Sequence, residues 1–490
     1  MIELKNVSFT YGSGEGIERG TAGGVDDTES NGSLFNLNLT VKEGDFVLLT
    51  GGSGCGKTTI LRLINGLIPS FFEGRLQGSV TVDGFDVSHA ELYDTAKIVS
   101  TVFQNPRSQF FNVDTTSELA FACENQGMEK DEILRRIDNV VKELHLEPLM
   151  NRSLFALSGG QKQKIACASV AVTGNKIILL DEPSANLDLR TIDELHDLLK
   201  KWKDEGKTII VAEHRISYLW DLADRTIVLK EGRIDQEFSR LQMDEMTETK
   251  LHQMGLRTNK STVIDTKCHS ELESQSLDLQ SQNENLIIEN FRCKYKNGYE
   301  ALNIPHMEIP VGKITAITGN NGEGKTTFLN CLCGLGHRSK GTLHYGGKVY
   351  KRRKRQKLIY LVMQDVNHQL FTESVLDEIE ISQNESDENA ARKILSMLDL
   401  EQFAERHPQS LSGGQKQRVA VASAIASGRD IMLFDEPTSG LDYTHMLQIG
   451  AILRELKAMG KTVIVVTHDR ELIKECCDCE IHLAEYKKIA

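Results

Sequence analysis

The sequence predicts an α/β fold with a mostly parallel sheet, built twice along one chain of 490 residues. Short apolar runs that fit strands alternate with stretches that fit helices, which is the pattern of strand–helix–strand units. The length also suffices for two domains with separate cores. One offset of 254 residues relates three pairs of positions: Ser158 and Ser412, Asp181 and Asp435, His214 and His468. Because this offset runs without a gap, we interpret the chain as a duplicated domain.

The elements of the first half can be assigned in chain order. Residues 2–9 and 34–41 alternate apolar and polar side chains, as half-exposed strands do. Residues 12–33 between them are rich in Gly, Ser, Thr and acids, and we expect a flexible surface insertion. Further strands are expected at 46–50, around 78–86, and at 98–103, 177–180 and 208–212. Helices are expected from 59, over 114–150, and at 162–172 and 191–205.

A glycine-rich loop of the form G-x-x-x-x-G-K-[ST] stands between a strand and a helix in each half. Its glycines let successive backbone N–H groups turn inward around a phosphate, while the Lys reaches the β- and γ-phosphates and the hydroxyl can bind Mg²⁺. The first loop and the next threonine are Gly51, Gly52, Ser53, Gly54, Cys55, Gly56, Lys57, Thr58 and Thr59. The second set is Gly319, Asn320, Asn321, Gly322, Glu323, Gly324, Lys325, Thr326 and Thr327. We therefore expect two ATP sites, with Thr58 and Thr326 as Mg²⁺ ligands.

Polar residues that follow apolar strands complete the chemistry expected of an ATPase. Two acids in a row after a buried strand are costly without a cation nearby. We expect the first acid to hold Mg²⁺, the second to act as general base, a Gln to approach the metal or the water, and a His to sense the γ-phosphate. The expected Mg²⁺ ligands are Asp181 and Asp435, and the expected general bases are Glu182 and Glu436. The glutamines are Gln104 and Gln364, and the histidines are His214 and His468.

A Leu-Ser-Gly-Gly-Gln stretch opens a helix in each half and predicts a second anion site made of backbone N–H groups. Its candidate residues are Ser158, Gly159, Gly160 and Gln161, and Ser412, Gly413, Gly414 and Gln415. Since each half already has one phosphate loop, a second anion site suggests that ATP is sandwiched between two domains.

These motifs resemble those of the ATP-binding cassette (ABC) ATPases over nearly the whole chain. The resemblance implies domains at 1–240 and 285–490, a linker at 241–284, and an intramolecular head-to-tail dimer of the two halves. One site would pair the loop at 51 with the stretch at 411, and the other would pair 319 with 157. It also implies that Tyr11 and Tyr295 stack on adenine, and that residues 184–188 and 438–442 link the two sites.

Composition narrows the class of partner and the location. A net charge of -13 and a pI near 5.6 argue against a general nucleic-acid binder. Apolar runs are far shorter than the ~18–20 residues that cross a bilayer, and the first residues do not fit a signal peptide. We expect a peripheral protein on the cytoplasmic side of the cell membrane, with reduced cysteines.

The segments 103–111 and 363–371 are similar to those of energy-coupling factor (ECF) importers, which take up vitamins and transition metals. The resemblance implies two integral membrane partners, a coupling protein and a substrate-binding subunit, with Phe110 and Phe111 facing the first. Two alternatives remain open: a soluble translation factor of the ABC-F type, and the ATPase of another importer. The ABC-F type carries a long basic helical linker, whereas residues 258–284 are polar and helix-poor.

A group of three cysteines and a run of basic residues are interpreted as structural features and not as functional sites. Cys476, Cys477 and Cys479 lack a second ligand pair at zinc spacing, so we do not expect a metal site. The basic run 351–355 has no counterpart in the first half, and we expect a solvated face rather than a lipid contact.

Overall fold

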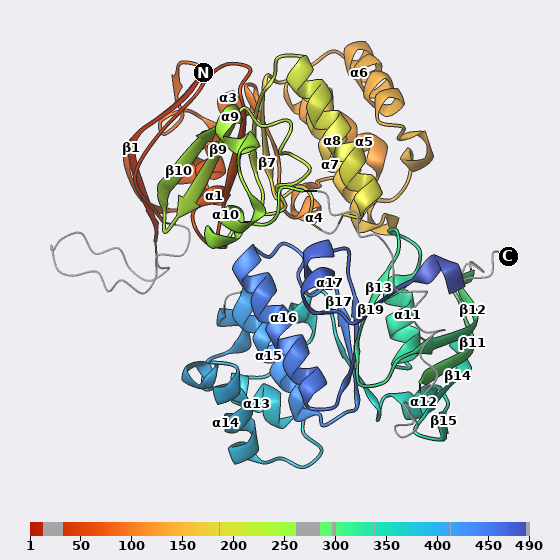
Figure 1. Ribbon diagram of the computed structural model, residues 1–490. Coiled ribbons are helices and arrows are strands. Elements are labelled where there is room, and N and C mark those ends of the chain that lie inside the picture. Colours follow the sequence, from red (N-terminus) through yellow and green to blue (C-terminus); the bar gives the residue numbers. More distant parts are fainter. Residues whose placement is uncertain are drawn as a thin grey trace. The chain divides into compact units, whose positions relative to one another are not determined.

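Two units make up the computed structural model, which describes residues 1–12, 33–185, 187–260, 285–295, 300–336, 339–411 and 413–486 (Figure 1). The first unit contains residues 1–261 and 440–444, and the second contains 262–439 and 445–490. Residues 13–32 of the insertion expected at 12–33, and most of the expected linker, lie outside the described residues.

An antiparallel sheet begins the first unit, in the order β2-β1-β4-β5. Its strands are β1 (Ile2–Tyr11), β2 (Leu34–Val41), β4 (Gly74–Val82) and β5 (Phe85–Asp86). The alternation predicted for β2 is confirmed, because Leu37, Leu39 and Val41 are buried and the residues between them are exposed. Ile2 pairs with Val41 on one side and with Val82 on the other.

A mostly parallel sheet forms the centre of the first unit, in the order β10-β9-β3-β8-β7-β6. Only the β10–β9 pair is antiparallel. The strands are β3 (Phe46–Gly51), β6 (Val99–Val102), β7 (Ile177–Asp181), β8 (Thr208–Ala212), β9 (Arg225–Lys230) and β10 (Arg233–Ser239). Every residue of β3, β7 and β8 is buried. Their carboxyl ends meet, since Ala212 pairs with Asp181 and with Leu49.

The helices of the first unit lie beside this sheet and in a separate helical part made by α5, α6 and α7 (Figure 1). The bounds are α1 (Lys57–Ile64), α2 (Leu67–Ser70), α3 (Leu92–Ala96), α4 (Pro106–Gln109), α5 (Thr115–Asn125), α6 (Lys130–Glu143), η1 (Glu147–Leu149), η2 (Leu154–Ala156), α7 (Gly159–Thr173) and α8 (Leu189–Asp204). The stretch 114–150 is therefore helical, as predicted. It breaks at Gly127, which has φ 71°, a conformation that glycine adopts without strain.

The first unit continues beyond residue 240, where the sequence suggested that the linker begins. Two short helices follow, α9 (Arg240–Asp244) and α10 (Glu248–Gln253). Met243 and Leu251 are buried in the core of the first unit together with Trp202, and the partly buried Trp220 packs against this core. The apolar side chains here are too widely spaced to form a long helical period, so the sequence did not reveal that they pack.

The second unit repeats this plan with two sheets, in the orders β12-β11-β14-β15 and β16-β17-β18-β13-β19. The strands are β11 (Leu286–Lys294), β12 (Glu300–Ile309), β13 (Ile314–Thr318), β14 (Ser339–Tyr345), β15 (Lys348–Tyr350), β16 (Ile359–Val362), β17 (Ile431–Asp435), β18 (Thr462–Val466) and β19 (Cys479–His482). The helices are α11 (Lys325–Leu332), α12 (Arg352–Arg355), η3 (Val366–His368), α13 (Val375–Glu380), α14 (Glu388–Met397), η4 (Glu401–Phe403), η5 (Pro408–Ser410), α15 (Gly413–Ala426), α16 (Tyr443–Ala458), α17 (Arg470–Cys476) and η6 (Leu483–Tyr486).

The basic run 351–355 is only partly the solvated face that we expected. Arg355 is 1% exposed, and its guanidinium donates to the carbonyls of Cys331, at 2.9 Å, and of Gly341. The guanidinium also lies 4.4 Å from the centre of the Phe291 ring. Burial lowers the pKa of Arg355 to about 10. The side chain therefore ties α11 to β14, a role that a run of basic letters does not reveal.

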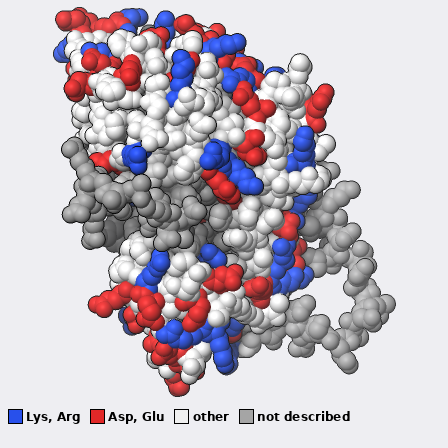
Figure 2. Space-filling model, turned by 90° about the vertical axis from the view of Figure 1, so that its left-hand side faces the viewer, with Lys and Arg blue, Asp and Glu red and all other residues white. Residues whose placement is uncertain are grey.

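No helix among the described residues is both long enough and apolar enough to span a bilayer. The described residues also contain no group of three His, Cys, Asp or Glu side chains arranged to hold a metal ion. Cys476 packs against the backbone, donating to the Leu472 carbonyl at 3.3 Å. On the face drawn in Figure 2, acidic and basic side chains are interspersed, without a broad area of one sign.

Candidate nucleotide sites

The first phosphate loop connects β3 to α1 and curls tightly at its glycines. Gly51 has φ 142°, and a Cβ there would lie 2.2 Å from the Leu229 carbonyl oxygen, so the neighbouring strand leaves no room for a side chain. Lys57 is 5% exposed, and its Nζ donates to the carbonyls of Gly51 at 3.2 Å and Gly52 at 2.9 Å. The ammonium group thus lies inside the loop, where a phosphate bound by the loop would meet it.

The second phosphate loop has the same construction between β13 and α11. Lys325 Nζ donates to the carbonyls of Gly319 at 2.8 Å and Asn320 at 3.1 Å. The loop differs from the first at three positions, where Asn320, Asn321 and Glu323 stand in place of Gly52, Ser53 and Cys55. Asn320 donates its side-chain amide to Glu323 at 2.8 Å, which braces the second loop from within.

Two of the three expected metal ligands of the first site are in contact, since Thr58 donates its hydroxyl to Asp181 at 3.0 Å. Burial, and next the charge of Glu182, raise the pKa of Asp181 to about 6. In the second site, burial likewise raises the pKa of Asp435, and Oδ1 of this buried carboxylate accepts no hydrogen bond from the part of the chain that the structure describes. A buried carboxylate of this kind is what a divalent cation stabilises, so both sites fit Mg²⁺.

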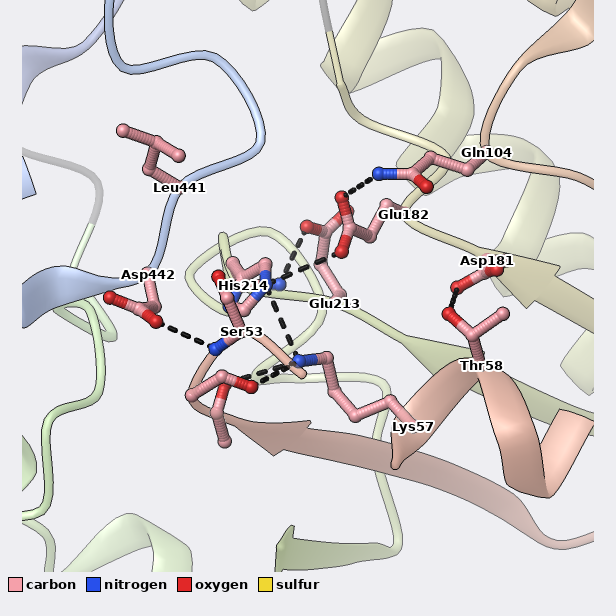
Figure 3. Close-up of polar contacts among 12 residues, drawn as sticks. Ser53, Lys57, Thr58, Gln104, Asp181, Glu182, Glu213, His214, Leu441 and Asp442 are labelled. Atoms are coloured by element: carbon pink, nitrogen blue, oxygen red, sulfur yellow. Dashed lines mark hydrogen bonds and ion pairs between the residues drawn. The ribbon is translucent and has the colours of Figure 1, made fainter. Parts of the chain in front are cut away.

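Glu182 and His214 lie together at the carboxyl end of the first parallel sheet (Figure 3). His214 Nε2 lies 3.3 Å from Glu182 Oε1 and 3.3 Å from Lys57 Nζ. Gln104 donates its side-chain amide to Glu182 at 2.7 Å. Burial acts to raise the pKa of Glu182, but the hydrogen bond and charge of His214, with Lys57, hold this pKa below its usual value. Glu182 is therefore ionised at neutral pH and able to accept a proton.

The second site repeats this pair, with His468 Nε2 lying 3.4 Å from Glu436 Oε1. Glu436 has φ 48° and Glu182 has φ 44°, a left-handed conformation that is uncommon for residues other than glycine. The amide of each Glu donates to the strand beside it at 2.8 Å, to the carbonyl of Ala212 or of Val466. These bonds hold the turn that aims both carboxylates. Gln364 follows β16 as Gln104 follows β6.

The Ser-Gly-Gly stretch of the first half opens α7, as predicted. Ser158 accepts from the Gln161 amide at 3.3 Å, and the Gln161 side chain accepts from the Ser158 amide at 3.0 Å. This capping box fixes the first turn of the helix. A Cβ at Gly159, or at its counterpart Gly413 in α15, would meet no atom within 4 Å, so the fold of each unit does not itself require glycine there. Ser412 lies outside the described residues.

The two tyrosines expected to stack on adenine are held in different surroundings. The Tyr11 hydroxyl contacts Thr59 Oγ1 at 3.1 Å and accepts from Arg62 at 3.0 Å. The Tyr11 ring also packs edge-on against Phe72, with ring centres 6.3 Å apart. In the second half, the Tyr295 hydroxyl contacts Thr327 at 2.7 Å, while 49% of its surface is exposed. Each tyrosine is therefore tied to the helix that follows its phosphate loop.

The segments after Gln104 and Gln364 each present one exposed Phe. Phe111 is 75% exposed and Phe371 is 72% exposed. The expectation for Phe110 is corrected, because this side chain packs against the core of the first unit.

A buried glutamate that the sequence did not single out holds each of these loops. Glu118 accepts from the Phe111 amide at 3.1 Å, and Glu378 accepts from the Phe371 amide at 3.1 Å. Both glutamates are at most 4% exposed. The sequence could have indicated these two residues, because a Glu stands seven positions after the exposed Phe in both halves.

The first unit also includes residues 440–444. Within it, Asp442 accepts from the Ser53 amide at 2.7 Å (Figure 3). The first phosphate loop is thus in contact with the segment that the resemblance assigned to linking the two sites.

Two parts of the chain, residues 34–185 and 302–439, match the family model of the ABC transporter. The chain belongs to this family. It is 43% identical to a putative ABC transporter ATP-binding protein of Treponema denticola over 97% of this chain and 94% of that protein. A second such protein of the same organism is 38% identical over 99% of this chain and 95% of its own length.

Among solved structures, the chain is similar to an RNase-L inhibitor, with a TM-score of 0.60 and 24% identity over 92% of this chain and 85% of that one. This likeness concerns the fold of two tandem cassettes. The chain is therefore an ABC-type ATPase with two ATP-binding cassettes, and it is the ATP-binding subunit of an ABC transporter.

Proposed function

We propose that this ABC protein is the ATP-hydrolysing subunit of an energy-coupling-factor importer for a vitamin or a metal ion. The protein acts at the cytoplasmic face of the membrane, bound to a transmembrane coupling protein and a substrate-binding subunit. The observation that carries the proposal is the pair of exposed aromatic side chains, Phe111 and Phe371, that follow Gln104 and Gln364 in segments similar to those of ECF importers.

The buried glutamates behind these loops support a docking role. Glu118 accepts two backbone amides, from Phe111 and Asn112, and Glu378 accepts two, from Phe371 and Thr372. The loops are therefore held by charge-assisted bonds while their aromatic rings stay in solvent. An exposed aromatic ring on a rigid loop is typical of an anchor for a partner protein, since little entropy is lost when it is buried.

The chemistry proposed for the first site begins with Lys57 contacting the β- and γ-phosphates of ATP. Thr58, Asp181 and Gln104 would hold Mg²⁺, which when bound neutralises charge that develops on the phosphate oxygens. The Glu182 carboxylate takes the proton of the water that attacks the γ-phosphorus. His214, already within 3.3 Å of Glu182, aligns this base and contacts the γ-phosphate.

The second site carries the same roles on Lys325, Thr326, Asp435, Gln364, Glu436 and His468. Tyr11 and Tyr295 stack on the two adenines, and each Ser-Gly-Gly helix start contacts the γ-phosphate of the ATP bound by the other cassette. The raised pKa of Asp181 and of Asp435 supports cation binding at both sites, because a cation favours the ionised carboxylate.

The test is purification of the tagged full-length chain from membranes of its own organism, with identification of what accompanies it. We expect a transmembrane coupling protein and a small substrate-binding membrane protein, and transport assays with that subunit would name the vitamin or metal. The variant Phe111→Ser with Phe371→Ser should lose this association and keep ATPase activity. Phe85→Ser, which alters a 54% exposed Phe on β5, is the matched control. Recovery of ribosomes in place of membrane subunits would overturn the proposal.

A further inference from the structure

Glu213 is a buried carboxylate next to the first nucleotide site, and neither the family roles nor the mechanism above use it. It follows β8 directly and is 3% exposed. It accepts hydrogen bonds from the amides of His214 at 2.7 Å, Arg215 at 3.0 Å and Ser184 at 3.2 Å, and from the Tyr218 hydroxyl at 3.1 Å. Among the described residues, no cation forms an ion pair with it.

All four partners of this carboxylate are hydrogen-bond donors. A buried anion is stabilised by such a set of neutral donors, and an uncharged amide in its place would direct one N–H₂ group at another donor. Burial, and next the charge of Glu213, raise the pKa of Tyr218 well above its usual value, so the phenol remains a donor. The surroundings of Glu213 therefore fit a carboxylate, both oxygens of which accept from donors on each side.

The four bonds join two segments that belong to different parts of the site. Ser184 stands two residues after Glu182, on the loop that leaves β7, whereas His214 stands on the loop that leaves β8. Oε2 of Glu213 accepts from the first loop and Oε1 from the second. The carboxylate thus fixes the distance between the backbone of the His and the backbone of the general base.

The second unit makes the same junction with a different residue. Thr467 occupies the position of Glu213, and Asp469 occupies that of Arg215. Thr438, the counterpart of Ser184, donates its hydroxyl to Asp469 at 2.7 Å, and the Asp469 amide donates to Thr467 at 3.0 Å. The acid stands before the His in one unit and after it in the other, yet it connects the same two loops in both.

We propose that Glu213 is the positioning residue that sets His214 against Glu182 in the first site, and that Asp469 has this task in the second. The inference rests on the proposed function of His214 and Glu182. It predicts that the acid is transferable between the two positions, which a general contribution of Glu213 to folding does not predict.

The test compares ATP turnover in four variants of the full-length chain, each also carrying Glu436→Gln, so that hydrolysis at the first site alone is measured. Glu213→Gln and Glu213→Thr should lower kcat about tenfold or more, with KM for ATP within about twofold, because a misplaced His costs rate rather than binding. Glu213→Thr with Arg215→Asp reproduces the Thr-His-Asp order of the second unit and should restore kcat to within about threefold of the parent. Arg215→Asp alone is the matched control. Nη1 of Arg215 is a buried nitrogen that makes no hydrogen bond to any of the described residues, so its removal should cost little.

A second arm uses His214→Ala. If Glu213 acts through His214, adding Glu213→Gln to His214→Ala should lower kcat by less than about twofold further. Full additivity of the two changes, or a double variant at positions 213 and 215 that is no faster than Glu213→Thr alone, would overturn the inference.

Failure of the proposed function gives a different result. In that case, Glu182→Gln and His214→Ala would leave ATP turnover unchanged, whatever the variants of Glu213 do. A variant of Glu213 that shows no thermal unfolding transition has not folded, and Tyr218→Phe then takes its place. This change removes one of the four donors to Glu213 and should lower kcat only about twofold.

Discussion

The first and second nucleotide sites have the same groups within reach of phosphate and different groups directly behind them. In both units a Lys folds into its own loop, and a His lies against a Glu at 3.3 Å or 3.4 Å. Behind these groups, the first unit has Glu213 and the second has Asp469. This difference indicates that the groups proposed to contact ATP are the same in both units, whereas the acid that holds the His and the Glu in place can stand at either of two positions.

The largest effect should come from removing either proposed general base. Glu182→Gln and Glu436→Gln should each slow turnover at their own site by ~10²-fold or more while leaving ATP binding intact, because the amide cannot take a proton from water. Single-turnover hydrolysis, with ATP occupancy measured in parallel, checks this. If one substitution changed nothing, the two sites would not be equivalent in chemistry, and the comparison above would be broken.

The pairing of the sites can be tested by combining changes. Lys57→Ala and Gly413→Asp should disable the same site in a head-to-tail pair, so their combination should still retain one bound nucleotide. Lys57→Ala with Gly159→Asp should disable both sites and retain none, since a site already lost cannot be lost again. Equilibrium dialysis with a non-hydrolysable ATP analogue gives the occupancy. The reverse pattern would mean that each cassette binds ATP by itself.

A smaller effect concerns pH. The folded-state pKa of Asp181 is raised to about 6 from 3.8, so the folded protein binds more protons than the unfolded chain between these values. Stability should therefore fall as pH rises from about 4 to 6, by up to ~3 kcal/mol at neutral pH, and Asp181→Asn should recover most of it. Urea unfolding without Mg²⁺ measures this. Asp435→Asn should act in the same direction on the second unit, and a loss of stability in either variant would contradict the proposed cation sites.

The smallest effect should be at the tyrosines. Tyr295→Ala removes a half-exposed ring and should weaken ATP binding by about tenfold, with little change in stability. Tyr11→Ala also loses the contacts with Phe72 and Arg62, so it should lower the thermal unfolding temperature as well. Nucleotide titration and thermal unfolding of both variants measure this difference between the two tyrosines. Equal losses of stability in the two variants would contradict it.

The parts of the fold that follow from local pattern could be predicted from the sequence. The strand at 208–212 and the alternation in β2 are found where the apolar residues predicted them. The candidate catalytic residues could be assigned to one site because each follows a buried strand, and parallel strands end at one edge of a sheet. The offset between the halves then related one site to the other.

What the sequence did not predict depends on contacts between distant residues. The packing of Met243 and Leu251 on the first core has no periodic signal, and the burial of Arg355 depends on carbonyls in α11 and β14. Glu213 did carry a signal, since an acid directly after a fully buried strand is costly without partners. Its partners could not be identified, because Ser184 and Tyr218 flank it only in the folded unit.

Both tryptophans of the chain belong to the first unit, where Trp202 is buried in the core and the partly buried Trp220 packs against it. Emission excited at the red edge of indole absorption therefore originates in that unit alone, and the second unit is optically silent at this wavelength. The chain thus carries a built-in reporter for one of two halves that share the same plan. Read this way, the unfolding of the Asp181→Asn variant is seen directly in the emission, while that of Asp435→Asn appears only in circular dichroism. The two cassettes can be followed separately without adding a label.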